Sequence, residues 1–321
     1  MAAKILCQTG KMTDQEWREV RKQGIGGSDA AVVCGLNPWK SAYALWLEKT
    51  GQVEEQDLSD NEKVFWGNAL EDKIAEVFAE RTGLKLWRQN AILQHPDYPF
   101  MFANIDRRVV GKNEGLEIKT TGEFNGKLWA DDKIPDMYFL QCQHYLAVTG
   151  ADKWHLAVLI GGQRLLIREV FRDTEIIASL IQREVAFWDC VTTGKIPELD
   201  GSESGADAIA QQFPESNSLI VDLPKEAENW ITVFETAGEQ ISELEKVQGK
   251  AKAELQMLLR ENEAGRIGQN LVIWKTQAGA RRLDGKRLKE EMPALYEDYL
   301  KEGESTRKFT IKKLKEGNKN G

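Results

Sequence analysis

The chain has 321 residues, enough for one large domain or two, with 43 Lys and Arg against 51 Asp and Glu. The formal net charge of −8 argues mildly against nucleic acid as a partner but does not exclude it, because a local basic surface matters more than the total. No apolar run reaches the ~20 residues of a membrane span, and the N-terminus lacks a signal-peptide core, so we expect a cytoplasmic protein.

Hydrophobic periodicity predicts three helices near the start of the chain, over 13–23, 41–50 and 64–82. Between the first two, the stretch GIGGSDAAVVCG indicates a glycine-rich turn that leads into a helix of small residues. The longest helix carries its apolar residues on one stripe, and Gly83 is its natural stop.

Strands are predicted over 84–93, 99–110 and 115–121, and the segment GKNEG joins the last two as a hairpin turn. A helix is predicted to follow over 137–149.

The stretch 154–172 indicates two more strands joined by a turn at Gly161-Gly162, and 173–192 indicates a long amphipathic helix. Helices and strands therefore alternate along residues 1–200. This order predicts an α/β core with a mixed central sheet and helices on its faces.

The segment 201–221 is rich in Gly, Ser and Asp and is predicted to link this core to a mainly helical C-terminal region, 222–321, with a small β element. In that region, strands are expected at 266–277 and 307–313, on either side of a helix over 284–301. The tail that begins at 307 carries six basic residues and one acidic one. A frayed, solvated end and a contact with nucleic acid explain this tail equally well.

A heptad seam runs through the first part of the C-terminal region, because nine residues follow each other in alternating steps of 4 and 3. They are Trp230, Phe234, Ala237, Ile241, Leu244, Gln248, Ala251, Leu255 and Leu258. Gln248 and the two alanines weaken the seam, which favours a helix packed on its own domain over a long intermolecular coiled coil.

The predicted hairpin brings three polar side chains to one face of a sheet. With a turn centred on Lys112–Asn113, Asp106 lies opposite Lys119 and diagonal to Glu117, within the ~5–8 Å between cross-strand neighbours. Two carboxylates so placed suit Mg²⁺ or Mn²⁺, to which the carbonyl of Ile118 can add an oxygen. Lys119 can orient or help deprotonate a water, or stabilise charge on a phosphate. A surface hairpin with a Glu–Lys ion pair is the alternative interpretation.

Three further polar residues lie on predicted helices around this hairpin. Glu71 is either a first-turn glutamate favoured by the helix dipole or a third metal carboxylate laid over the cluster. Gln141 and Tyr145 are four residues apart and share a helix face, either as a half-buried polar pair or as part of the site.

These residues resemble the motifs of the PD-(D/E)XK nucleases. Asp106 followed by Glu117-Ile118-Lys119 is similar to their D…(D/E)-x-K core, and Trp66-Gly67-x-x-x-Glu71 is similar to the helix motif that precedes it. Gln141-x-x-x-Tyr145 resembles the Q-x-x-x-Y motif of the RecB-like branch. Gly26-Gly27-Ser28-Asp29-Ala30 resembles the opening motif of the YqaJ-like viral recombinase family, which is akin to phage lambda exonuclease.

The resemblance implies a restriction-endonuclease-like core and a two-metal phosphodiester hydrolase, with Mg²⁺ (or Mn²⁺ in its place) held by Asp106, Glu117, Ile118 and Glu71. For lambda-like members it implies 5′→3′ degradation of double-stranded DNA ends by a ring-shaped trimer, in the host cell of a phage or prophage. The 3′-ended strand that remains is then handed to a single-strand annealing protein for recombination.

The sequence departs from the pattern in two places. Ile105 stands where the proline of the family name precedes Asp106, which leaves the chemistry intact. Cys7, Cys34 and the other two cysteines lie far apart without C-x-x-C spacing, which argues against a local zinc site and against the iron–sulfur cluster of some RecB-like relatives.

Arg21 and Ser28 stand seven residues apart, as do an arginine and a serine that hold the 5′-phosphate in the lambda-like pattern. Ser28 at a helix N-terminus suits an anion, but it can equally cap its helix while Arg21 is solvated. Two other functions stay open: a structure-specific endonuclease or nickase, and an inactive DNA-binding recombination module. The intact Asp106, Glu117 and Lys119 argue against the inactive module.

Overall fold

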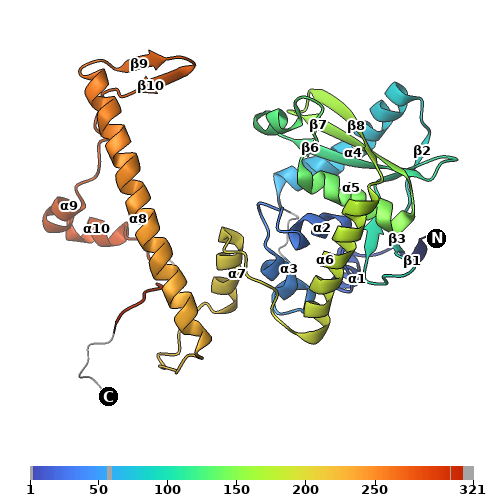
Figure 1. The fold of residues 1–321 in the computed structure, drawn as a ribbon, viewed down its shortest axis with the longest axis horizontal. Helices are drawn as coiled ribbons and strands as arrows, with labels where there is room; N and C mark the ends of the chain where they lie inside the picture. Colours follow the sequence, from blue (N-terminus) through green and yellow to red (C-terminus); the bar gives the residue numbers. More distant parts are fainter. Residues whose placement is uncertain (1–2, 56–59, 304, 314–321) are drawn as a thin grey trace. The chain divides into compact units, whose positions relative to one another are not determined.

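The structure is a computed structural model that describes residues 3–55, 60–303 and 305–313 (Figure 1). The chain divides into two compact units, Met1–Phe213 and Pro214–Gly321. Within the described ranges, none of the helices combines the length and the apolar composition that a membrane-spanning helix needs.

A five-stranded sheet forms the centre of the first unit, in the order β2 (Leu86–Trp87), β5 (Arg107–Val109), β6 (Glu114–Thr121), β7 (Lys153–Ile160) and β8 (Arg164–Phe171). Strands β6 and β7 are parallel, and the other neighbours are antiparallel. The predicted α/β core with a mixed sheet is confirmed.

Helices cover both faces of this sheet (Figure 1). Leu116 and Ile118 of β6 pack with the apolar side chains of α4 (Glu62–Thr82), whereas Trp154 of β7 packs with α5 (Asp136–Thr149). Because side chains alternate along a strand, Glu117 and Lys119 of β6 must face α5. This alternation positions the site described below.

The turn between β5 and β6 differs from the prediction. Arg107 pairs with Leu116, which centres the turn one residue earlier than Lys112–Asn113. Gly111 accounts for this position, because it adopts φ of +77°, in the left-handed region that favours glycine. The pairing moves by two residues as a result, and a move of two leaves every side chain on its predicted face.

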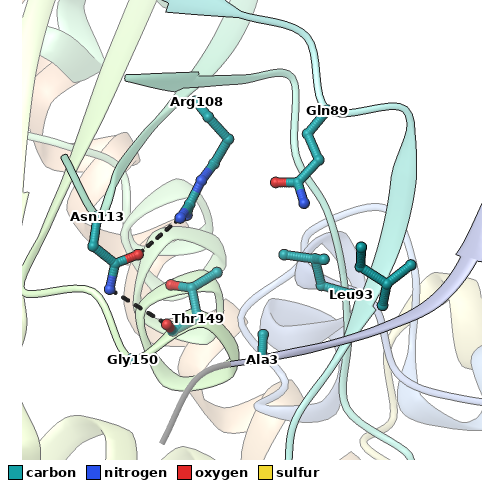
Figure 2. A pocket seen from close by; sticks show the side chains of 8 residues that line it. Ala3, Gln89, Leu93, Arg108, Asn113, Thr149 and Gly150 are labelled. Carbon is teal, nitrogen blue, oxygen red and sulfur yellow. Dashed lines mark hydrogen bonds between the residues drawn. The ribbon is translucent and has the colours of Figure 1, made fainter. Parts of the chain in front are cut away.

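The same turn is tied to the end of α5. The Nη2 group of Arg108 donates to Asn113 Oδ1 at 2.8 Å, and Asn113 Nδ2 donates to the carbonyl of Thr149 at 3.5 Å (Figure 2). The hairpin that carries the candidate site is therefore anchored at its far end.

A second, three-stranded antiparallel sheet consists of β1 (Lys4–Gln8), β3 (Ala91–Gln94) and β4 (Phe102–Asn104). Strand β1 is not among the predicted elements. The segments 84–93 and 99–110 are each predicted as one strand, but within each of them the chain leaves one sheet and joins the other. In the second segment this change falls at residues 105–106, so Asp106 lies between two strands.

The remaining predicted helices of the core are present. They are α1 (Asp14–Lys22), α2 (Gly27–Val33), α3 (Ala42–Lys49) and α6 (Thr174–Thr193). Thr13 begins the first of them with a capping box, which satisfies N–H groups that the helix itself leaves free.

The segment predicted as a linker, 201–221, begins instead with a helix, α7 (Glu203–Gln212). Ala208 of this helix is buried, and Ser204 Oγ accepts a hydrogen bond from the Ser41 N–H at 3.0 Å. A buried alanine and a side-chain bond to α3 hold α7 on the first unit, and the division of the chain follows Phe213.

One buried ion pair connects three elements of the core. His144 of α5 lies 2.8 Å from Glu184 of α6 and 2.8 Å from the carbonyl of Phe102 in β4, and both charged side chains are fully buried. Burial lowers the pKa of His144, but the charge of Glu184 outweighs it, so the pKa is raised. The two hydrogen bonds of His144 therefore tie α5 to α6 and to β4.

The second unit consists of α8 (Glu226–Leu259), a hairpin of β9 (Ala264–Ile267) and β10 (Asn270–Ile273), and the helices α9 (Gly285–Glu291) and α10 (Pro293–Asp298). It is mainly helical with a small β element, as predicted.

Three details of this unit differ from the prediction. The expected strand 266–277 overlaps the β9–β10 hairpin, which ends at Ile273. Pro293 divides the expected helix 284–301, because proline has no N–H group to donate to a helix hydrogen bond. The stretch 307–313 forms no strand. The basic tail beyond residue 313 lies outside the described residues.

The heptad seam lies on α8, of which only Leu259 is buried. Seam residues such as Trp230 and Leu244 are exposed, and Phe234 contacts the ring of Phe309 at 5.5 Å between centroids. Most of the seam is therefore uncovered within its own unit.

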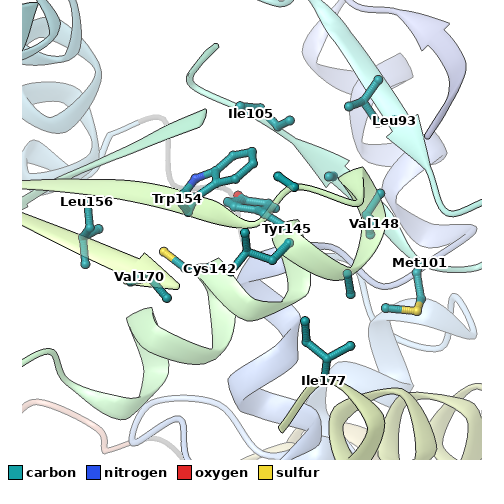
Figure 3. Close-up of a cluster of buried hydrophobic side chains, with 14 of the residues drawn as sticks. Leu93, Met101, Ile105, Cys142, Tyr145, Val148, Trp154, Leu156, Val170 and Ile177 are labelled. Carbon is teal, nitrogen blue, oxygen red and sulfur yellow. The ribbon is translucent and has the colours of Figure 1, made fainter. Parts of the chain in front are cut away.

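The layer between the central sheet and α5 is apolar and closely packed (Figure 3). Tyr145 packs on the fully buried Trp154, with ring centroids 5.3 Å apart. Trp154 in turn covers Gly115, its register partner on β6. A Cβ atom at Gly115 would lie 2.1 Å from Trp154 Cζ2, so only glycine leaves room for this ring.

Replacing Gly115 by alanine is therefore expected to destabilise the first unit by roughly 3 kcal/mol, because neither the strand nor the buried ring can move away. Urea unfolding followed by tryptophan fluorescence measures this. Gly122→Ala is the matched control, because a Cβ there meets no atom within 4 Å, and its unfolding midpoint should stay near that of the parent. Equal midpoints for Gly115→Ala and Gly122→Ala would contradict the packing described here.

Candidate active site

Glu117 and Lys119 project from β6 towards α5, on the face that strand alternation assigns to them. Asp106 lies opposite Glu117, because of the pairing between β5 and β6. Its Oδ2 atom accepts a hydrogen bond from the backbone N–H of Ile118 at 2.8 Å. The three predicted side chains thus converge, although Asp106 faces Glu117 and not Lys119.

Glu117 is the centre of the cluster and is only 3% exposed. Its Oε1 atom accepts from Lys119 Nζ at 2.5 Å and from Gln141 Nε2 at 2.6 Å. Gln141 Nε2 also donates to the hydroxyl of Tyr145 at 2.9 Å. The helix pair Gln141 and Tyr145 therefore holds the carboxylate of Glu117 from the α5 side.

The charges of this cluster are unbalanced. Burial and the negative charge of Glu117 raise the pKa of Asp106 well above its ordinary value. Burial lowers the pKa of Lys119, but the charges of Glu117 and Asp106 outweigh it, so the pKa of Lys119 is raised and its ammonium group stays protonated. When Asp106 is ionised, one ammonium faces two carboxylates, and a bound cation would supply the missing positive charge.

The donor set fits a hard divalent cation. The Oε2 atom of Glu117 is buried and has no hydrogen-bond partner among the described residues, whereas a buried carboxylate oxygen is normally bonded. The N–H of Ile118 points to Asp106, and the N–H and carbonyl of one strand residue point to the same side, so the carbonyl of Ile118 is directed there too. Mg²⁺ is commonly held by one or two carboxylates and completes its shell with water.

The described residues hold no larger carboxylate cluster. Within the described part of the chain, no three His, Cys, Asp or Glu side chains form a group that could hold a metal ion. The protein ligands available here are therefore Asp106, Glu117 and the main chain at Ile118.

A cleft of about 220 Å³ opens over this cluster. Arg21 and Ser28 line it together with Asp106, Glu117 and Lys119. Arg21 Nη2 lies 3.4 Å from Ser28 Oγ. The residues predicted to bind a phosphate and the residues predicted to bind a metal thus share one cleft, although they come from opposite ends of the first 120 residues.

Arg21 is not a freely solvated side chain. Its guanidinium lies 4.8 Å from the ring centroid of Trp17, 3.4 Å from Asp29 and 3.1 Å from Glu55. Asp29 is itself buried and lies 2.9 Å from the Nζ atom of Lys49. Burial raises the pKa of Asp29, but the charges of Lys49 and Arg21 outweigh it and hold the pKa far below its ordinary value.

Asp29 and Lys49 were not predicted as site residues. Asp29 enters the sequence prediction only as part of the Gly26–Ala30 motif. Lys49 lies near the end of a helix, and its position in the sequence does not indicate that its side chain is only 4% exposed in the folded chain. Together they fix the backbone and side chain of Arg21, since Lys49 Nζ also donates to the Arg21 carbonyl at 2.8 Å.

The approach of α2 to α5 explains one glycine of the motif. A Cβ atom at Gly27 would lie 2.5 Å from Cε1 of Tyr145. Without a side chain there, α2 can approach α5 closely enough for Ser28 to line the cleft.

Glu71 is not among the residues of the cleft. It lies on α4, at the opposite face of the sheet, where its Oε1 atom is 2.5 Å from Arg107 Nη1 and 3.0 Å from Arg88 Nη2. Asp72 forms ion pairs with the same two arginines. Glu71 is thus paired with Arg107 and does not line the cleft, although its negative charge lies close enough to Asp106 to help raise the pKa of that carboxyl group.

Comparisons with known proteins agree with these motifs. Residues 16–152 match the model of the YqaJ-like viral recombinase domain. The chain is 39% identical over 316 residues to the uncharacterized protein YqaJ of Bacillus subtilis (strain 168), which covers 97% of this chain and 98% of that protein.

Two solved structures are similar at lower identity. An alkaline exonuclease from Laribacter hongkongensis is 18% identical with a TM-score of 0.49, over 56% of this chain and 94% of that one. A phage-related exonuclease from Haemophilus somnus 129PT is 14% identical with a TM-score of 0.42, over 56% of this chain and 99% of that one.

The charge imbalance generates a stability prediction for Asp106→Asn. Because the folded-state pKa of Asp106 is raised, the free energy of unfolding falls as pH rises from the unfolded pKa through the folded one, and ionised Asp106 opposes folding at neutral pH. Without divalent cations, the variant should gain on the order of 1 kcal/mol, or roughly 2–4 °C in Tm.

Added Mg²⁺ should raise the Tm of the parent and leave that of Asp106→Asn nearly unchanged, since a ligand stabilises only the state that binds it. Thermal unfolding at pH 7.5 with chelator and with Mg²⁺ measures both effects. Asp152→Asn controls for a general loss of one negative charge. An equal Mg²⁺ response in parent and Asp106→Asn would count against a metal at this cluster.

Proposed function

The chain belongs to the YqaJ-like viral recombinase family, and we propose that it is a Mg²⁺-dependent deoxyribonuclease that degrades double-stranded DNA from its ends. The observation that carries this proposal is the buried Glu117, which has one oxygen without a hydrogen-bond partner among the described residues and lies beside Asp106 and a protonated Lys119. Such a set is costly to bury unless it is used.

Asp106, Glu117 and the carbonyl of Ile118 would hold the metal, two ions being expected and Mn²⁺ being a possible substitute. When bound, the metal supplies Lewis-acid polarisation of the phosphate and lowers the pKa of a coordinated water. Glu71 was expected as a further ligand, but its ion pairs with Arg88 and Arg107 support a role in holding β5 against α4.

The side chains around the metal ligands have distinct tasks. Lys119, as an ammonium group at the floor of the cleft, would orient the attacking water and stabilise the negative charge that grows on the phosphate. Gln141 and Tyr145 line the same cleft, and their hydrogen bonds would fix the direction of the Glu117 carboxylate. This fixed geometry supplies the positioning that phosphodiester hydrolysis requires.

Arg21 and Ser28 support a preference for the 5′ end. Both line the cleft that contains the carboxylates, and Arg21 is held in place by Asp29 and Trp17. A terminal 5′-phosphate bound there would set the scissile bond of the first nucleotide beside Glu117. Digestion would then run 5′→3′ and leave 3′ single-stranded overhangs. A single-strand annealing protein would use these overhangs in phage-type recombination, and the nuclease itself would act as a ring-shaped homotrimer.

The first test is digestion of end-labelled linear duplex in the presence of Mg²⁺, Mn²⁺, Ca²⁺ or chelator. Activity is expected with Mg²⁺ and Mn²⁺ only, and Glu117→Gln and Lys119→Met should each lower the rate ~100-fold or more. Glu71→Gln should lose less, since Glu71 lies outside the cleft. Arg164→Met, a change at an exposed arginine, is the control.

Closed circular duplex separates the exonuclease from an endonuclease or nickase. The circle should stay intact under conditions that consume the linear form. An Asp106→Ala variant as active as the parent would rule out both kinds of nuclease at this site.

The second test concerns the terminal phosphate. Ends with a 5′-phosphate should be digested ~10-fold faster than 5′-hydroxyl ends, because a charge-assisted contact to Arg21 is lost with the phosphate. Arg21→Ala should abolish this preference, and Lys22→Ala, its neighbour that pairs with Glu19, should keep it. Equal rates on both ends in the parent would remove the support for 5′→3′ polarity.

A further inference from the structure

A second pocket, of about 570 Å³, lies where the β5–β6 turn meets the end of α5 (Figure 2). One wall is polar and carries Gln89, Arg108 and Asn113. The opposite wall comes from the small sheet and is apolar, with Ala3, Ile5 and Leu93. It shares no lining residue with the cleft of the candidate active site.

Two polar atoms in this pocket are buried and have no hydrogen-bond partner among the described residues. They are Nη1 of Arg108 and Oε1 of Gln89, and both side chains point into the pocket in Figure 2. A buried polar atom left without a hydrogen-bond partner lowers the stability of the folded chain. Two such atoms in one pocket indicate a place for a ligand.

Among the described residues, the positive charge of Arg108 has no counter-ion. Its neighbour Arg107 forms ion pairs with Glu71 and Asp72 on the other face of the sheet. Arg108 instead donates to the neutral side chain of Asn113 at 2.8 Å, and no carboxylate of the described residues pairs with it. Burial lowers the pKa of Arg108, as expected for a desolvated cation without an anion nearby.

The donors of the polar wall match an oxyanion. Nη1 of Arg108 supplies two N–H groups, and Asn113 Nδ2 has one N–H beyond its bond to Thr149. A half-turn of the Gln89 amide exchanges its unpartnered oxygen for its NH₂ group. Carboxylate and phosphate oxygens are the strongest acceptors for such donors.

The size of the pocket exceeds what a lone phosphate fills, and its volume lies in the range of small-molecule sites. We propose that this pocket binds a small organic oxyanion, a phosphate or carboxylate carried on an apolar or planar body. The charged group contacts Arg108, Gln89 and Asn113, and the body lies against Ile5 and Leu93. This binding does not depend on the proposed nuclease activity.

Calorimetric titration of the full chain in chelator tests the proposal with four probes: phenyl phosphate, benzoate, inorganic phosphate and benzamide. Phenyl phosphate, benzoate or both should bind at least ~10-fold more tightly than inorganic phosphate and benzamide, because only they join an oxyanion to an apolar body. Which of the two binds identifies the source of the oxyanion. Benzamide binding as tightly as benzoate and phenyl phosphate, or no binding of either anion, would overturn the proposal.

Variants locate the binding. Arg108→Met should weaken it ~10-fold or more, whereas Asp106→Asn in the active-site cleft and Arg164→Met at the surface should leave it unchanged. Asn113→Asp is a second variant of nearly identical shape that gives Arg108 an internal counter-ion. It should weaken the probe that binds, although it also removes the Nδ2 donor to the Thr149 carbonyl. Undiminished affinity in Asn113→Asp, or a loss in Asp106→Asn equal to that in Arg108→Met, would place the ligand elsewhere.

Discussion

The burial of the Glu117 carboxylate between the central sheet and α5 is the constraint on which the site depends. An ionised carboxylate in an apolar layer needs donors and a counter-charge. Lys119 and Gln141 supply two donors to one oxygen, while the other oxygen is left for a ligand. Asp106 adds a second negative charge instead of relieving the first. The cluster is therefore poised to take a cation, which is why we interpret it as a metal centre and not as a structural ion pair.

The two-sided packing of the sheet makes this cluster possible. Leu116 and Ile118 complete the core under α4, and the alternate residues of the same strand are free to carry charge. Two glycines then create the space that the cluster needs. Gly115 accommodates the ring of Trp154, which supports Tyr145, and Gly27 lets α2 approach Tyr145. Through that approach, Arg21 and Ser28 reach a cleft formed by residues about a hundred positions later in the chain.

The same alternation separates two neighbouring arginines. Arg107 faces α4, where it neutralises Glu71 and Asp72, and Arg108 faces α5, where its hydrogen-bond partner among the described residues is the side-chain amide of Asn113. Strand β5 therefore carries an arginine with two ion pairs on one face. On its other face it carries an arginine that forms no ion pair with the described residues. The contrast explains why Glu71 is paired with Arg107, and it is also the basis of the proposed anion pocket. Arg107 is paired because the acidic residues of α4 lie over its face of the strand. Arg108 is not paired in this way because the β5–β6 turn presents a neutral side chain to it.

The sequence by itself determined the features that depend on short-range pattern. Strand alternation placed Glu117 and Lys119 on one face, helix spacing paired Gln141 with Tyr145, and the order of elements gave the mixed sheet. The predicted turn was centred one residue too late, which changed the strand pairing by two residues. A change of two residues leaves each side chain on its predicted face of the sheet. Only the tertiary structure decided which distant residues meet. Three examples are the ion pair of Glu71 with Arg107, the burial of Lys49 beside Asp29 and the packing of α7 on α3. Each joins two segments whose local sequences do not indicate their partner. Their energies arise from desolvation and charge pairing in the folded chain, which no local pattern records.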